Sequence, residues 1–152
     1  MLYDLLQFVH VLSAIVAVGF NASYGIWLAT AAKNPDHTAF TLRVIKTLDD
    51  KFANPAYVLL LITGLGMVFE SGIPLFDMFW LSTSLGIYIA LTLIALLAFT
   101  PTLRKQVELA EGGRMDDPQF AELAKRNSLL GAVLGVMVVV IVYLMVVKPE
   151  VG

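Results

Sequence analysis

The sequence predicts an all-α protein, a polytopic membrane bundle of four transmembrane helices with an amphipathic cytoplasmic helix in the first connection. Hydrophobic residues make up 59% of the 152 residues, more than the roughly half that is usual in soluble domains. The apolar residues gather into four runs of the kind that crosses ~30 Å of hydrocarbon, and the charged residues gather between these runs. Residues 1–152 are therefore expected to form a single membrane domain.

The limits of the spans follow from prolines, caps and interfacial aromatic residues. The first span ends before Pro35, which cannot continue a helical hydrogen-bond ladder. The second is short, and Pro55 at its start predicts a boundary or a kink. The third carries Trp80 near one end as an interfacial anchor and stops before Pro101. The fourth continues a helix that begins with Asp117 as its N-cap. The predicted spans are residues of about 5–31, 55–69, 78–99 and 128–147.

Between the first two spans, residues of about 37–53 have the periodicity of an amphipathic helix. Its apolar face is expected from Phe40, Val44, Ile45, Leu48 and Phe52, opposite Arg43, Lys46 and Asp50. Such a helix either lies in the headgroup plane or extends the second span into the water. In both cases Asp50 and Lys51 are expected on a solvated face.

The basic residues predict the topology. Nine of the ten fall in the first and third connections: Lys33, Arg43, Lys46, Lys51, Arg104, Lys105, Arg114, Lys125 and Arg126. The second connection has no basic residue, and the tail has Lys148 alone. The positive-inside rule then places the first and third connections in the cytoplasm and both termini outside. The expected location is the bacterial inner (plasma) membrane.

One stripe of the first span carries polar side chains. At about 100° per residue, His10, Ala14, Ala17, Asn21 and Tyr24 fall close to one line along the helix. A polar group in hydrocarbon costs several kcal/mol unless it finds a partner. The stripe is therefore expected to face protein or a polar pocket, with His10 in the outer half and Asn21 about 16 Å deeper.

His10 is the candidate ligand of a cofactor or metal, because neutral imidazole is a common ligand of haem iron and copper. It is the histidine that lies within a span, whereas His37 belongs to the opposite side. The candidate arrangements are His10 alone, His10 with a thioether, or two His10 residues across a homodimer. The candidate thioethers are those of Met67, Met78 and Met145, and imidazole with thioether would suit Cu(I). The alternative is that His10 only ties helices together.

Short stretches of the chain resemble known membrane families. Leu6-Gln7-Phe8-Val9-His10, Asn54-Pro55-Ala56 and Phe79-Trp80-Leu81 are similar to the corresponding parts of the HemJ-type protoporphyrinogen oxidases and of the CopD-type membrane domain. The chain is closest in layout to a family of four-helix bacterial integral membrane proteins of unknown function within this wider group. The HemJ resemblance implies haem b on His10, and the CopD resemblance implies copper handling.

One departure limits what the resemblance implies. HemJ-type proteins carry a lysine early in the third span, where this chain has Ser84 and no lysine elsewhere in that span. The departure argues against protoporphyrinogen oxidation and leaves haem or metal binding at His10 open.

Three functions follow from these patterns. The first is a membrane protein with a haem or metal site at His10, serving redox or porphyrin chemistry. The second is a non-catalytic subunit or assembly factor of a larger membrane complex, without a cofactor. The third is a small-solute carrier, which four spans would form only as a homo-oligomer. In each case the lipid bilayer is the surrounding partner, and nothing in the sequence indicates nucleic-acid binding.

Overall fold

The computed structural model describes residues 1–31 and 33–149, and in this part of the chain it contains helices and no strands. Four long helical stretches are long and apolar enough to cross a membrane. They comprise α1 (Leu2–Ala31), α2 and α3 (Thr38–Leu48 and Asn54–Ser71), α4 and α5 (Phe79–Ile94 and Thr100–Glu111), and α6 (Pro118–Val147). The predicted all-α fold with four spanning helices is confirmed.

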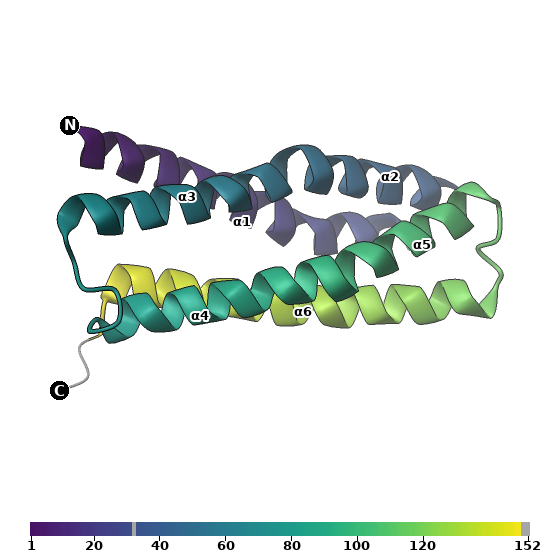
Figure 1. Cartoon of the computed structure of the whole chain (residues 1–152). Coiled ribbons are helices and arrows are strands. Elements are labelled where there is room, and N and C mark those ends of the chain that lie inside the picture. The colour runs from purple at the N-terminus through teal and green to yellow at the C-terminus, as the bar shows by residue number, and fades with distance from the viewer. Residues whose placement is uncertain (32, 150–152) are drawn as a thin grey trace.

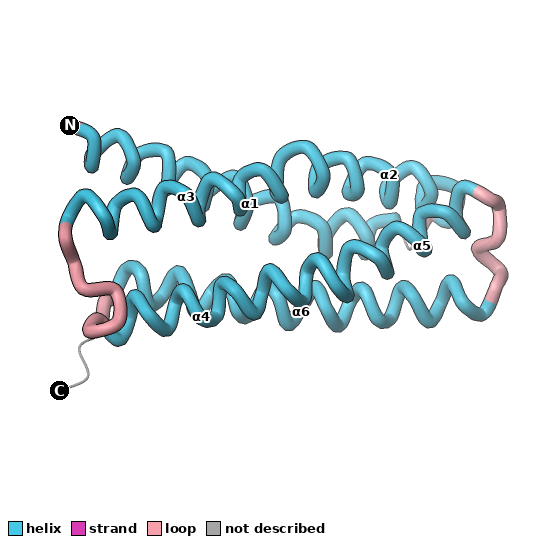
Figure 2. The backbone as a smooth tube through the Cα atoms, in the orientation of Figure 1, coloured by secondary structure: helices cyan, strands magenta, loops and turns pink. Residues whose placement is uncertain are grey.

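The four stretches run up and down along one bundle (Figure 1). Leu2, Val147 and the connection between α3 and α4 lie at one end, which we call the terminal end. The connections between α1 and α2 and between α5 and α6 lie at the other, which we call the connection end (Figure 2). The first and third connections thus share one side of the bundle, as the distribution of basic residues predicts.

Two π-helical turns replace the breaks expected at the prolines. Asp49–Ala53 joins α2 to α3, and Ala95–Phe99 joins α4 to α5. Each π turn ends two residues before a proline, Pro55 or Pro101. A proline lacks the N–H donor and its ring clashes with the carbonyl four residues earlier, so a wider turn at this position lets the helix continue. The amphipathic segment therefore extends the second span as a stalk.

The helices pack as two pairs. Helix α1 packs most extensively against α3, and α6 packs against α4 and α5. The pairs meet through α2 and α5 at the connection end, where a buried core forms from Tyr24, Leu42, Ile45, Leu103, Val107 and Ala110. A direct α3–α4 contact is not among the substantial contacts of the described residues, although these helices are consecutive.

Local signals at the ends of α6 agree with the sequence. Asp117 caps the helix, since its carboxylate accepts a hydrogen bond from the backbone N–H of Gln119 at 2.9 Å. Gly113 has a φ of +67° in the turn that precedes it, a conformation that favours glycine. At the terminal end the ammonium of Lys148 lies 5.2 Å from the ring centroid of Trp80. This cation–π contact joins the start of α4 to the end of α6.

The buried core at the connection end gives a test of the fold. Leu42 is 0% exposed, whereas Phe40 on the same helix is 61% exposed. Replacing a buried leucine with alanine removes packing and leaves a cavity, which costs roughly 2–5 kcal/mol. We expect Leu42→Ala to lower the unfolding free energy by that amount and Phe40→Ala to lower it by less than about 1 kcal/mol. Reversible unfolding in mixed micelles measures both, and equal effects would contradict this core.

Candidate functional site

His10 lies in a close part of the α1–α3 contact, where a glycine of α3 leaves room for its ring. A Cβ added at Gly64 would lie 3.2 Å from His10 Cε1 and 3.6 Å from Nδ1. One residue before this glycine, Thr63 Oγ1 lies 3.0 Å from His10 Nδ1. The imidazole is half-buried and faces a neighbouring helix with a hydroxyl partner.

The hydroxyl of Thr63 determines the tautomer of this imidazole. Its single proton is donated along its own helix to the carbonyl of Leu59 at 2.6 Å, with the carbonyl of Leu60 at 3.4 Å. The hydroxyl oxygen can then only accept a hydrogen bond from His10, which requires the proton to be on Nδ1. The lone pair of His10 is therefore on Nε2, and Nε2 is the atom that can bind a metal.

The structure places two of the candidate thioethers, those of Met67 and Met145, on different helices. Met67 lies on α3 one turn from Thr63, so the two residues share a helical face. Met145 lies on α6, which packs chiefly against α4 and α5. The atoms nearest to a Cβ at Gly64 all belong to His10. The structure thus brings His10 to Thr63 and Gly64, with Met67 one turn further along, and does not bring Met145 into this contact.

Deeper in the bundle, Asn21 joins α1 to α3. Its amide nitrogen donates to the backbone carbonyl of Ala17 at 2.8 Å and to the hydroxyl of Tyr57 at 3.0 Å. The backbone carbonyl of Tyr57 accepts a hydrogen bond from the hydroxyl of Tyr88 on α4 at 2.8 Å. These contacts connect three helices near the middle of the bundle, where lipid would offer no partners.

Tyr24 completes the stripe and lies within the core at the connection end. It is 5% exposed, and its hydroxyl has no hydrogen-bond partner among the described residues. A buried hydrogen bond at this end joins α6 to α5, where the amide nitrogen of Asn127 donates to the amide oxygen of Gln106 at 2.6 Å.

One buried polar residue was missed by the sequence analysis. Asp49 is 6% exposed, although its neighbours Asp50 and Lys51 are exposed as expected. The predicted apolar face of the amphipathic helix is confirmed in part: Ile45 is buried, and Val44 and Leu48 are half-buried. Phe40 and Phe52 are exposed, whereas Leu42 and Asp49, which were not assigned to this face, are buried. The buried positions are Thr41, Leu42, Ile45, Asp49 and Ala53. Their spacing of three and four residues is the signal that could have placed Asp49.

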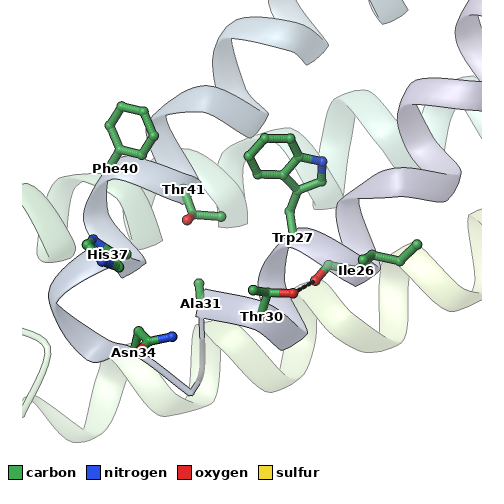
Figure 3. A pocket seen from close by; sticks show the side chains of 8 residues that line it. All are labelled: Ile26, Trp27, Thr30, Ala31, Asn34, His37, Phe40 and Thr41. Atoms are coloured by element: carbon green, nitrogen blue, oxygen red, sulfur yellow. Dashed lines mark hydrogen bonds between the residues drawn. The ribbon is translucent and has the colours of Figure 1, made fainter.

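A cavity of about 450 Å³ opens at the connection end, away from His10. In Figure 3 the rings of Trp27 from α1 and Phe40 from α2 lie on opposite sides, with Thr41 between them. His37 and Asn34 line it from the connection between the two helices. The second histidine of the chain therefore belongs to a separate, open site at the other end of the bundle.

The arrangement defines a helical integral membrane protein with one imidazole ordered between two helices. The whole of this bundle, residues 4–149, matches a family described as a predicted integral membrane protein, DUF2269. The chain belongs to this family, and its four apolar helices imply a lipid bilayer as its environment. The comparison with curated proteins gave no match, and the comparison with solved structures gave none.

The close contact at Gly64 can be tested by adding a methyl group. Gly64→Ala would place a Cβ 3.2 Å from the His10 ring, so we expect the ring to be displaced and the unfolding free energy to fall by about 1–3 kcal/mol. Gly86→Ala is the matched control in another spanning helix, because nothing lies within 4 Å of its added Cβ. We expect the control to keep its stability or to gain up to about 1 kcal/mol, because alanine favours a helix over glycine. Equal losses in the two variants would exclude the contact.

Proposed function

We propose that the protein binds haem b through Nε2 of His10 and serves electron transfer or porphyrin chemistry in the membrane. The observation that carries the proposal is the hydrogen bond between His10 and Thr63, which holds the imidazole in the tautomer that leaves Nε2 free. Partners of this kind orient metal-binding histidines and raise their basicity. The resemblance of the residues around His10 to the HemJ type supports the same ligand.

The donor set fits a haem better than a bare metal ion. A zinc site takes three or four ligands from the protein, and no group of three or more His, Cys, Asp or Glu residues that could hold a metal is found among residues 1–31 and 33–149. A porphyrin supplies four nitrogens itself and needs one or two axial ligands. Bound at His10, a haem would supply one-electron transfer.

An apolar macrocycle would meet apolar side chains on the outer faces of both helices. On α1, Phe8 and Val11 are exposed close to His10 in the sequence, and on α3, Leu59 and Ile62 are exposed close to Thr63. A second axial ligand would come from Met67 or from His10 of a second copy, and the absorption spectrum distinguishes these, because bis-imidazole and imidazole–thioether haems differ.

The absorption spectrum of the purified protein, expressed with haem supplied, tests the proposal. We expect a Soret band that is lost in His10→Ala and retained in His37→Ala, which removes the histidine of the other end. Thr63→Val removes the hydroxyl that accepts from Nδ1 and keeps the shape of the side chain, so we expect haem affinity to fall about 10–100-fold. A colourless wild-type protein, or a band that depends on His37, would overturn the proposal.

We also propose that the terminal end faces the outside of the inner membrane. The arginines and lysines of the connection end support this orientation. Because the chain has no cysteine, single introduced cysteines report the side directly. In intact cells we expect an impermeant maleimide to label Ser71→Cys, at the end of α3, and to label Asp116→Cys, before α6, only after lysis. Labelling of Asp116→Cys in intact cells would reverse the orientation.

A further inference from the structure

A buried carboxylate lies at the connection end without a basic partner among the described residues. Asp49 is 6% exposed, and the ion pairs of the described residues join other groups: Arg43 to Glu111, Lys46 to Asp50, and the N-terminus to Asp4. The side-chain partner of Asp49 is Asn54, whose amide nitrogen lies 3.3 Å from Oδ2. A carboxylate removed from water is costly unless its charge is neutralised.

The π turn and the carboxylate of Asp49 share one partner, Asn54. The backbone N–H of Asn54 donates to the carbonyl of Asp49, which closes the wide turn, and the side chain of Asn54 donates to the carboxylate of the same residue. Asn54 thus fixes both the backbone and the side chain of Asp49. Single π-helical turns of this kind are frequent at functional sites.

A second, independent observation comes from helix α1. The hydroxyl of Tyr24 is fully buried and has no partner in the described part of the chain, and α1 packs against the π turn that begins with Asp49. The packing places it there: Phe20 contacts Phe52 with ring centroids 5.5 Å apart, and Tyr24 lies one turn further along α1, opposite the start of the π turn. The orphaned hydroxyl and the buried carboxylate therefore belong to the same contact between α1 and the π turn.

Other polar groups lie on the neighbouring turns of the same helical stretch. Tyr57 follows Asn54 by three residues, so the two share a helical face, and its hydroxyl accepts a hydrogen bond from Asn21 of α1. The charged residues Asp50 and Lys46 pair with one another. The set thus consists of the buried carboxylate of Asp49, the buried hydroxyl of Tyr24, the half-buried hydroxyl of Tyr57 and the half-buried amide of Asn54, whose N–H donates to the carboxylate.

We propose that Asp49, Tyr24, Tyr57 and Asn54 form a binding site for one small monovalent cation, either a sodium ion or a proton, entering from the aqueous edge of the connection end. Hard oxygen donors suit alkali-metal ions and protons rather than soft transition metals. One carboxylate balances a single positive charge, and a divalent ion would leave excess charge in an apolar setting. The site is separate from His10 and does not depend on haem.

Melting temperatures of the full chain in detergent test the site with two probes. In the first arm, sodium chloride replaces choline chloride at pH 8 and constant ionic strength; in the second, the pH is lowered from 8 to 5 in choline chloride. We expect the wild-type melting temperature to rise in one of the two arms, because a bound cation stabilises the folded state. The arm that responds identifies the cation.

Two variants locate the response. Asp49→Asn removes the charge that the cation neutralises, so we expect its melting temperature to be independent of that cation. Asp50→Asn, the exposed neighbour, should respond as the wild type does. A response that comes from other groups is common to the wild type and both variants, so the comparison with Asp49→Asn removes it. Tyr24→Phe removes one ligand, and we expect the midpoint of the response to move at least threefold in cation concentration.

Three outcomes would overturn the site. They are a wild-type protein that responds to neither probe, a response that persists unchanged in Asp49→Asn, and a response that Asp50→Asn abolishes. If Asp49→Asn does not fold, the wild-type titration and the shift of its midpoint in Tyr24→Phe together test the cation site.

Discussion

The structure depends on one constraint: within a bilayer, polar groups have to find their partners inside the protein. Helix α1 carries its polar side chains along the line that faces α3, and each level of that line has a different partner. His10 meets the hydroxyl of Thr63, Ala17 is fully buried against the neighbouring helix, and Asn21 meets the hydroxyl of Tyr57. Hydrogen bonds of this kind between membrane helices contribute about 0.6–2 kcal/mol each, so together they fix the register of α1 on α3.

The same register gives His10 its chemistry. A histidine that packed against lipid would have no fixed tautomer and no defined orientation. Here the helix of Thr63 accepts the threonine proton, the threonine oxygen accepts the imidazole proton, and the glycine next to it leaves space for the ring. A contact that contributes to stability thus also presents one nitrogen with a free lone pair, which is what an axial haem ligand requires.

The two prolines show how a local sequence feature affects the course of a helix. Pro55 and Pro101 each follow a π turn at the same distance, and both helices continue through them. Asp49, the first residue of the turn before Pro55, already lies on the buried face of α2, because it follows Thr41 and Ile45 at steps of four residues. The wide turn then lets α3 continue past the proline and gives the carbonyl of Asp49 a donor in the N–H of Asn54.

The sequence by itself determined the number of spanning helices, the sharing of one side by the first and third connections, and the cap at Asp117. These follow from hydropathy, from charge and from hydrogen-bond chemistry within a few residues. It also selected the stripe of His10, Asn21 and Tyr24, because helical periodicity alone places these residues on one face. Only the tertiary structure decided which groups that stripe meets: Thr63, Tyr57 and the surroundings of Asp49 lie 25 to 53 residues away along the chain. The physical reason is that the rotation of each helix about its axis is set by its packing against the other helices, which involves residues far apart in the sequence.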